Sequence, residues 1–393
     1  METKRVVITD REHIKDEELL EAAKILRTGG LVAFPTETVY GLGGNALDEE
    51  AAGKIYAAKG RPSDNPLIAH VSCTAELKPL VKEIPEAGRK LMEAFWPGPL
   101  TMIFPKSDRV PYGTTGGLDT VAVRMPNDAV ANRLIALAGV PVAAPSANTS
   151  GRPSPTTADH VWQDMNGRID MIIDGGAVGI GVESTIVDVS SDIPTVLRPG
   201  AITMEMLKEV LGEVAVDPAI LGPVSAGMRP KAPGMKYKHY APKADLTLVE
   251  PLRNGAELPE NALDGCTVGL GSCQDLACAR QPGMDEDGIR RMVDMVGRLA
   301  EKKAAEGLRT GIIGTDESIE SYKSLKGIDS FLVRSIGARR SQESVAHNLY
   351  AVLREFDDLG VDVIFSESFS EDHLGQAIMN RLSKAAGYKI VRV

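Results

Sequence analysis

The sequence is poor in cysteine and in aromatic residues, and it contains no long hydrophobic run. Four of its 393 residues are cysteine, and aromatic residues make up only 4%. No cysteines form a C-x-x-C pair, and Cys273 and Cys278 have no neighbouring histidine, so the pattern predicts reduced thiols without a zinc site. The longest apolar run, residues 134–145, contains Gly139 and Pro141 and is shorter than the roughly 20 residues of a membrane span.

An excess of positive charge is also lacking. The 44 Lys and Arg residues are outnumbered by 54 Asp and Glu residues, which gives a formal net charge of −10. A general nucleic-acid-binding domain is usually basic, so the balance argues against that class without excluding a local basic site. The N-terminal stretch METKRVVITDREHIKDEELL has no apolar signal core, which favours a soluble, cytoplasmic protein without membrane contact.

The two common phosphate-binding motifs are missing as well. The sequence has no G-x-x-x-x-G-K-[ST], and the glycine-rich stretches GLGGNA and GLGSCQ both lack the last glycine of G-x-G-x-x-G. A nucleotide would therefore have to be bound by another arrangement of residues.

The length and the patterning predict two α/β domains, because single cores rarely grow beyond about 250–300 residues. In the first half, helices are predicted over residues 16–30, 48–60, 75–84, 86–95, 128–139, 157–167 and 204–212. Strands are predicted over residues 31–35, 67–71, 100–105, 120–126, 141–145, 169–174, 184–190 and 195–199. Some of these strands follow one another directly and others are separated by helices, which predicts a twisted mixed sheet.

A loop of unusual composition follows this first domain. Residues 217–243 contain five prolines, three glycines, five Lys or Arg residues and one acidic residue. Long loops without regular structure are usually functional lids or linkers. Beyond the loop, short apolar runs such as residues 266–271 alternate with helical patterns, which predicts a small Rossmann-like parallel domain. We therefore expect a catalytic domain at residues 1–215, a lid at 216–243 and a C-terminal α/β domain at 244–393.

The stretch AAKGRPSDNPLIAHV places two cations on a rigid turn. Lys59 and Arg61 flank Gly60, and Pro62 and Pro66 stiffen the chain around them. A guanidinium can bond two oxygens of a phosphate or carboxylate at once, so the pair is a candidate anion site. A solvated helix end, where the helix dipole favours cations, explains the same residues.

Further candidates lie at the ends of predicted strands. Ser146 and Asn148 present a hydroxyl and an amide after one strand, as an anion site or as an ordinary capped turn would. Arg124 and Arg198 end two other apolar strands, where a buried guanidinium needs a carboxylate or a ligand as its partner. His70 lies near the end of a fourth strand, and taken alone it is more often a core or surface residue.

Together these motifs resemble a known family, the YrdC-like threonylcarbamoyl-AMP synthases. The motifs occur in that family's order and cover about residues 10–210: PTETVYGLGGNA, KGRPSDNPLIAHV, FWPGPLT, VAVRMP, PSANTSGRPSPT, ESTIVDV and LRPGAI. The stretch SAGMRPKAPGMKYKHYAPKADL resembles the interdomain loop of the longer, two-domain members. LYAVLREFDDLGVDVIF and LGQAIMNRLSKAAG resemble their C-terminal domain.

The resemblance implies a YrdC-like twisted sheet with an open cavity, and a nucleotidyltransferase that makes L-threonylcarbamoyl-AMP. The substrates would be L-threonine, bicarbonate and ATP, pyrophosphate would leave, and a tRNA threonylcarbamoyl-transferase complex would use the product. Lys59 and Arg61 would be the catalytic cations. The implied ATP side consists of Lys59, Arg61, Asn65, Thr120, Ser146, Asn148, Ser154, Arg198 and Tyr240. The implied threonine side consists of Thr38, His70, Arg124, Ser184 and the backbone of Ala144.

The implied chemistry needs no metal ligand from the protein, because Mg²⁺ prefers phosphate oxygens and water and would arrive with ATP. A carbamate would form on the threonine amine and attack the α-phosphate, with catalysis mainly by positioning, charge stabilisation and exclusion of water. The residues identify no general base, and contact with tRNA would be weak. Two alternatives stay open: a non-catalytic module for double-stranded RNA, which the net charge opposes, and a carbamoyl-adenylate enzyme with another acceptor.

Overall fold

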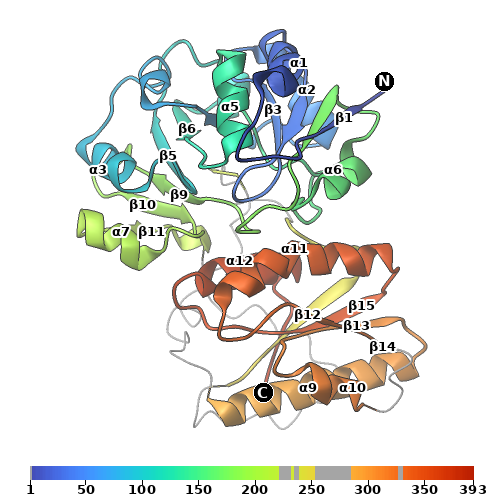
Figure 1. Cartoon of the computed structure of the whole chain (residues 1–393). Helices are drawn as coiled ribbons and strands as arrows, with labels where there is room; N and C mark the ends of the chain where they lie inside the picture. Colours follow the sequence, from blue (N-terminus) through green and yellow to red (C-terminus); the bar gives the residue numbers. More distant parts are fainter. Residues whose placement is uncertain (1, 221–231, 234–238, 253–284, 326–330) are drawn as a thin grey trace. The chain divides into compact units, whose positions relative to one another are not determined.

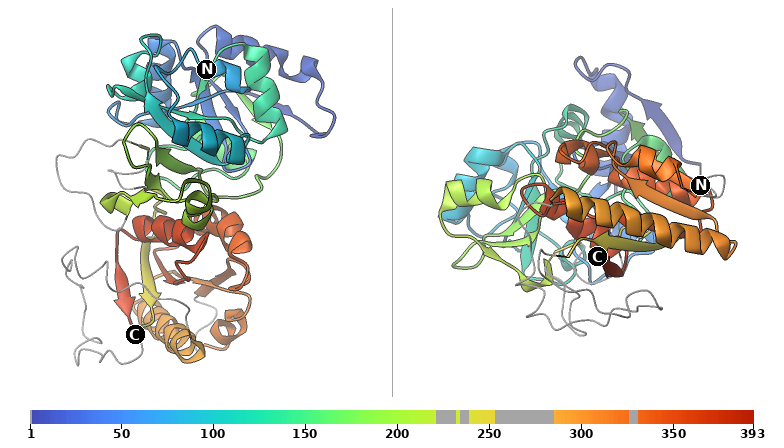
Figure 2. Two further views of the ribbon diagram at one scale, coloured as in Figure 1. Left: turned by 90° about the vertical axis from the view of Figure 1, so that its left-hand side faces the viewer. Right: turned by 90° about the horizontal axis from the view of Figure 1, so that it is seen from below.

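The computed structural model describes residues 2–220, 232–233, 239–252, 285–325 and 331–393. The chain divides into two compact units, with the described residues up to Ile220 and Ala232–Pro233 in the first and those from His239 onward in the second. Figures 1 and 2 show the elements of each unit. We describe each unit by itself.

The first unit consists of short strands and helices that alternate irregularly. Its strands are β1 (Lys4–Val7), β2 (Val32–Phe34), β3 (Gly41–Asn45), β4 (Ile68–His70), β5 (Leu100–Pro105), β6 (Thr120–Arg124), β7 (Val142–Ala143), β8 (Met171–Asp174), β9 (Thr185–Asp188), β10 (Thr195–Arg198) and β11 (Ala215–Val216). Its α-helices are α1 (Asp16–Arg27), α2 (Glu49–Lys59), α3 (Glu86–Phe95), α4 (Tyr112–Thr115), α5 (Ala129–Ala138), α6 (Ala158–Met165) and α7 (Met204–Leu211). Two 3-10 turns cover Thr74–Glu76 and Pro218–Ile220.

These strands form one 11-stranded sheet in the order β1-β8-β2-β3-β7-β4-β6-β5-β9-β10-β11. Neighbours such as β4 and β6 are parallel, whereas β5 and β6 are antiparallel. The prediction of a mixed sheet is therefore confirmed. Helices α1 and α5 pack together on β2, β7 and β8, where Leu19, Leu134 and Phe34 belong to one buried cluster.

Three strands and two helices differ from the prediction. β1, β3, β11 and the short helix α4 were not expected. β3 reads Gly-Leu-Gly-Gly-Asn, and glycine has low strand propensity. Gly43 is needed there: a Cβ at this position would lie 2.7 Å from the Phe34 ring and 2.8 Å from the Val142 side chain. The predicted helix at 75–84 was wrong, since only a 3-10 turn forms, at Thr74–Glu76. Pro79 explains the difference, because proline removes a helical N–H and clashes with the preceding turn.

The second unit has regular alternation. Its described elements are β12 (Asp245–Glu250), α9 (Glu286–Ala305), β13 (Thr310–Gly314), α10 (Ile319–Lys323), β14 (Phe331–Ser335), α11 (Gln342–Asp358), β15 (Val363–Glu367), α12 (Gly375–Ala385) and β16 (Ile390–Arg392). The strands form a 5-stranded sheet in the order β14-β13-β15-β12-β16, and all of the pairings are parallel. The prediction of a parallel α/β domain is confirmed. The strand predicted at 266–271 lies outside the described residues.

Helices cover both faces of this parallel sheet, as parallel sheets require. Figure 1 shows α11 and α12 on one face and α9 and α10 on the other. In the view from below in Figure 2, α9 lies in front of the strands. Met292 and Val296 of α9 are fully buried against Ile312 and Phe365 of the sheet. Within the described part of the chain, no helix is both long and apolar enough to cross a membrane.

Candidate active site

The strand register brings several of the predicted residues to one edge of the first sheet. β4 and β6 are parallel, and their last residues, His70 and Arg124, are paired neighbours. β5 runs the other way, so Thr101, near its start, is paired with Arg124. β9 is parallel to β5, and Ser184 immediately precedes it. Four segments that are distant in sequence, the ends of β4 and β6 and the starts of β5 and β9, therefore meet at one edge because of strand order and direction.

These side chains also share one face of the sheet. Side chains alternate along a strand, so Arg124 lies on the same face as Ala122, and Thr101 on the same face as Ile103. The apolar residues of this face form one buried cluster: Ile68, Ile103, Ala122, Ile186, Leu197, Ala219 and Ala232. Ala232 comes from the predicted lid and is fully buried. A described part of that loop therefore packs on the face that carries the candidate site.

Arg124 is the most constrained charged group at this edge. Its Nη1 donates a hydrogen bond of 2.9 Å to Thr38 Oγ1, and its Nε donates one of 3.3 Å to the carbonyl oxygen of Gly98. Its Nη2 lies 2.8 Å from Glu37 Oε2, with both side chains largely buried. Burial would raise the pKa of Glu37, but the Arg124 charge and the N–H of Asn127 outweigh it and hold that pKa below its usual value.

His70 is neutral in this environment. The ring is buried, and burial together with the nearby Arg124 charge lowers its pKa to about 3. Its Nδ1 lies 3.0 Å from the carbonyl oxygen of Ile68. A carbonyl can only accept, so Nδ1 carries the proton and the other ring nitrogen is an acceptor. His70 is therefore fixed as a neutral hydrogen-bonding group.

Ser184 joins Arg198 to the same edge. Arg198, at the end of β10, donates from Nε to the Ser184 carbonyl oxygen at 3.0 Å and from Nη2 to Ser184 Oγ at 3.1 Å. Ser184 Oγ also lies 2.8 Å from Thr101 Oγ1. All three side chains are buried. Through the Ser184 hydroxyl, a second guanidinium, that of Arg198, is therefore connected to Thr101 at the start of β5.

Lys59 connects the turn after α2 to the serine–asparagine loop. Its buried Nζ donates to the carbonyl oxygen of Ser146 and, at 2.5 Å, to that of Asn148. Ser146 Oγ in turn donates to Asn148 Oδ1 at 2.5 Å. Lys59 is 87 positions from Ser146 and 89 from Asn148 in the sequence. The two predicted anion-binding segments therefore meet at its ammonium group.

Arg61 and Asn65 lie on the turn beside Lys59. Arg61 donates from Nε to the carbonyl oxygen of Asn65 at 3.3 Å and from Nη2 to that of Pro66 at 3.0 Å. Asn65 is buried, and its Oδ1 accepts no hydrogen bond from any residue that the structure describes. Ser154, also predicted, donates from Oγ to Glu183 Oε1 at 2.5 Å. An amide oxygen that is buried without a donor is the kind of atom that a ligand completes.

Of the other three predicted residues, Ala144 lies beside β4, next to His70, whereas Thr120 and Tyr240 lie farther from Arg124. Thr120 begins β6, at the opposite end of that strand from Arg124. Ala144 packs in the core with α1 and α5, and its N–H donates to the carbonyl oxygen of Ile68 at 2.8 Å. Tyr240 belongs to the second unit, where its ring stacks on Tyr350 with centroids 5.4 Å apart.

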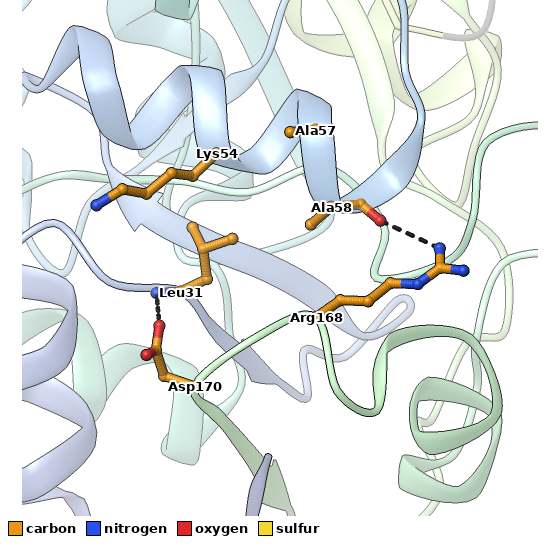
Figure 3. Close-up of a pocket in the computed structure, with 6 residues that line it drawn as sticks. All are labelled: Leu31, Lys54, Ala57, Ala58, Arg168 and Asp170. Carbon is orange, nitrogen blue, oxygen red and sulfur yellow. Dashed lines mark hydrogen bonds between the residues drawn. The ribbon is translucent and has the colours of Figure 1, made fainter. Parts of the chain in front are cut away.

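A separate hollow opens at the starts of β2 and β8 (Figure 3). It has a volume of about 470 Å³, and none of its lining residues was predicted for the site: Leu31, Lys54, Ala57, Ala58, Arg168 and Asp170. Two of its charged side chains form hydrogen bonds to the backbone: Lys54 donates to the carbonyl oxygen of Gly29, and Asp170 accepts from the N–H of Leu31. We assign these contacts a structural role.

Sequence reasoning missed Glu37, Thr101 and Glu183 as members of the site. Glu37 lies inside the motif PTETVYG and could have been found by asking which acid balances the strand-end arginine. Thr101 gave no signal beyond its place in an apolar strand. Within the described ranges, no three His, Cys, Asp or Glu side chains gather closely enough to hold a metal ion.

Family comparisons cover nearly the whole chain. A family model named Sua5_yciO_yrdC, with the description "Telomere recombination", matches residues 24–200. A second model, described as "Threonylcarbamoyl-AMP synthase, C-terminal domain", matches residues 202–387. The chain is 45% identical over 388 residues to a threonylcarbamoyl-AMP synthase of Pyrococcus abyssi, covering 99% of each chain. It is 43% identical over 395 residues to that of Bacillus subtilis, covering 100% of each chain.

A solved structure agrees with these relatives. The crystal structure of Pyrococcus abyssi Sua5 complexed with L-threonine has 44% sequence identity and a TM-score of 0.84 and covers 100% of both chains. The similarity therefore extends over both units.

Proposed function

The chain belongs to the Sua5/YrdC family of threonylcarbamoyl-AMP synthases, and on that premise we propose that the strand-end face around Arg124 binds its amino-acid substrate. The activity is the synthesis of threonylcarbamoyl-AMP, a nucleotidyl transfer that serves threonylcarbamoyladenosine modification of tRNA. The archaeal relative was crystallised with L-threonine, so the same amino acid is the ligand that we assign to this face.

The observation that carries the assignment is the incomplete bonding of Arg124. Its Nη1 and Nε donate to Thr38 and Gly98, whereas Nη2 lies 2.8 Å from Glu37 Oε2 in an ion pair without a well-directed hydrogen bond. A second carboxylate could align with this guanidinium, because a carboxylate matches its planar fork. We therefore assign the threonine carboxylate to Arg124.

The other groups of this edge suit the rest of the amino acid. His70 is neutral and offers one acceptor nitrogen, while Thr38 and Ser184 offer hydroxyls. These groups are matched to the threonine hydroxyl and amine, and the backbone at Ala144 would close the pocket from the core side. A site that hydrogen-bonds a substrate hydroxyl rejects analogues without it more strongly than a site that senses only a methyl group.

The ATP side is proposed on the second cluster. Lys59, Arg61 and Arg198 would offset phosphate charge, and the unsatisfied Asn65 Oδ1 would accept from an N–H of the nucleotide. Thr120, Ser146, Asn148, Ser154 and Tyr240 complete the proposed set. The cationic character of the cluster does not suit a metal, so Mg²⁺ would be carried by the ATP phosphates, where it neutralises charge. Lys59 and Arg61 are the proposed catalytic cations.

The proposed reaction has two stages. The threonine ammonium group first loses a proton to solvent, and the free amine adds to carbon dioxide derived from bicarbonate, which gives a carbamate and releases a second proton. A carbamate oxygen then attacks the α-phosphate of ATP in line and displaces pyrophosphate. The arginines and lysine stabilise the developing negative charge. The protein contributes orientation and exclusion of water, because a carbamate is readily lost in water.

The loop at 216–243 is proposed as the lid of this site. Most of it, residues 221–231 and 234–238, lies outside the described residues. Of the rest, Ala232 is buried on the site face of the first sheet, and Tyr240 stacks on Tyr350 within the second unit. The loop carries five Lys or Arg residues and one acidic residue, which suits a cover that closes over a triphosphate. Protection of residues 226–243 from proteolysis by ATP, Mg²⁺ and threonine would support the lid, and equal cleavage with and without them would exclude it.

Two wider assignments stay predictions. The product is labile and is expected to pass to a transferase complex that modifies tRNA, and the protein is expected in the cytoplasm.

The central experiment is mass spectrometry of the product made from ATP, bicarbonate and each of threonine, serine and valine. We expect threonylcarbamoyl-AMP as the main product and a weaker signal with serine, because a missing methyl costs only about 1–3 kcal/mol. Equal turnover of all three amino acids would contradict the threonine site.

A further inference from the structure

Glu37 is held in a fixed place beside the proposed threonine site. It lies in the loop between β2 and β3, where Thr36 Oγ1 accepts from the N–H groups of Thr38 at 3.2 Å and Val39 at 3.3 Å. The Glu37 carbonyl oxygen accepts from the N–H of Ile180 at 2.8 Å. Its side-chain Oε1 accepts from the N–H of Asn127 at 3.1 Å. The backbone and one carboxylate oxygen are therefore fixed, and only Oε2 is left to act.

Glu37 Oε2 and Arg124 Nη2 form an open pair. They lie 2.8 Å apart and form a buried ion pair, and the Arg124 charge holds the pKa of Glu37 below its usual value. Within the described residues neither atom has a well-directed hydrogen bond. A carboxylate oxygen and a guanidinium N–H group therefore stand side by side, and each can take a further, better-aligned partner.

The surrounding charges leave this pair electrically balanced. His70, on the neighbouring strand, is neutral, and Asp128 is already paired with Arg11. The four charged groups, Glu37, Arg124, Asp128 and Arg11, sum to zero at neutral pH. A ligand with a net charge would leave a buried excess, which is costly, whereas a zwitterion would not.

An α-amino acid matches this pair in both charge and size. Its carboxylate and its ammonium group are attached to one carbon, so an acceptor and a donor that are adjacent in the protein can reach both. We propose that Glu37 and Arg124 together bind the zwitterionic head of the amino acid, with Glu37 Oε2 accepting a hydrogen bond from the α-ammonium group. This inference rests on the proposed threonine site at Arg124 and adds Glu37 as a specificity-determining residue.

The proposal predicts which part of the substrate Glu37 senses. Threonine should bind as the ammonium form, which predominates near neutral pH. Its deaminated analogue, 3-hydroxybutanoate, keeps the carboxylate and the hydroxyl but has nothing to donate to Glu37. Threoninamide keeps the ammonium group and lacks the carboxylate. Glu37 should therefore matter for threonine and threoninamide and not for 3-hydroxybutanoate.

The test is calorimetric binding of the three ligands to the full chain and to Glu37→Gln, which keeps the acceptor for the Asn127 N–H. We expect Glu37→Gln to weaken threonine and threoninamide by about tenfold to a hundredfold, as for loss of a hydrogen bond to a charged group. Binding of 3-hydroxybutanoate should be unchanged or tighter. Glu21→Gln, which removes an acid from an exposed pair with Lys4, is the matched control and should change nothing.

Each outcome separates ammonium binding from its alternatives. If Glu37→Gln weakens 3-hydroxybutanoate as much as threonine, Glu37 only positions Arg124 and the inference is overturned. Unchanged threonine binding overturns it as well. If Arg124→Gln leaves 3-hydroxybutanoate binding intact, the proposed site itself fails, and the inference fails with it. Should Glu37→Gln unfold, Glu37→Asp keeps the charge, and it must retain the preference for threonine over 3-hydroxybutanoate.

Discussion

Each unit contains a buried glutamate–arginine pair at a strand end, and the two pairs differ in how completely they are bonded. Glu367, at the end of β15, accepts from the hydroxyls of Ser318 and, at 2.8 Å, Tyr322, and it pairs with Arg339. The Glu37 side chain accepts from the Asn127 N–H through Oε1, and its Oε2 lies 2.8 Å from Arg124 Nη2 in an ion pair without a well-directed hydrogen bond. The first pair is closed and the second is open.

The difference indicates what each pair does. A buried carboxylate whose two oxygens both accept hydrogen bonds rigidifies the surrounding fold, and the bonds of Glu367 join the segments that follow β13 and β14 to β15. An unsatisfied pair costs free energy in the unliganded protein, and such a cost is typical of a functional site. We therefore expect the closed pair to govern stability and the open pair to govern binding. Four experiments test this difference between the two pairs.

The largest effect is expected for Glu367→Gln. Removing one charge of a buried pair leaves the other uncompensated, so the free energy of unfolding of the second unit should fall by about 3 kcal/mol. Threonine affinity should be unchanged. Hydrogen exchange of β13–β15 under mild denaturant measures the first quantity and calorimetry the second. Unaltered exchange in those strands would show that the network contributes no stability.

Arg124→Gln should produce the opposite pattern. Losing the partner of a buried carboxylate typically costs about 2–5 kcal/mol of binding free energy, so threonine affinity should drop at least tenfold. Arg5→Gln is the matched control, because Arg5 pairs with Asp159 and Asp174 on the other edge of the sheet. Comparable threonine affinity in both variants would place the carboxylate elsewhere.

The third effect is a pH dependence of stability in the first unit. The pKa of His70 is lowered to about 3 in the fold, so below pH 6.5 the unfolded state binds a proton that the folded state does not. Stability should therefore fall as the pH drops, by up to about 1.4 kcal/mol per pH unit. Chemical denaturation between pH 6.5 and 5 measures this slope. In His70→Gln the slope should become shallower, and an unchanged slope would mean that His70 is already charged.

The smallest effect is expected for Tyr322→Phe. The change removes one of the hydroxyls that donate to Glu367 and leaves the ring in the core, at a cost of about 1 kcal/mol. The loss should appear in the unfolding of the second unit and not in threonine affinity. If Tyr322→Phe weakens threonine binding instead, the closed pair is not purely structural.

The element types and most of the candidate residues could be predicted from the sequence. Helix caps and strand-like runs located most of the helices and strands, because local propensity and periodicity are properties of neighbouring residues. Lys59, Arg124 and Arg198 stood out for the same reason: a cation at the end of an apolar segment is visible in a single line of sequence. Strand β3 was missed because Gly43 is required by the close approach of Phe34 and Val142, and Val142 is distant in sequence.

Only the tertiary structure decided which of these residues act together. Arg124 meets Thr38 across 86 positions, and Lys59 meets Asn148 across 89. These meetings depend on strand order and direction in the 11-stranded sheet, which no local pattern encodes. Whether the two glutamate–arginine pairs are hydrogen-bonded is even harder to predict from the sequence, because it depends on bond angles and burial in the folded protein. For that reason Glu37 was seen as part of a motif, and its open oxygen beside Arg124 became visible only in the fold.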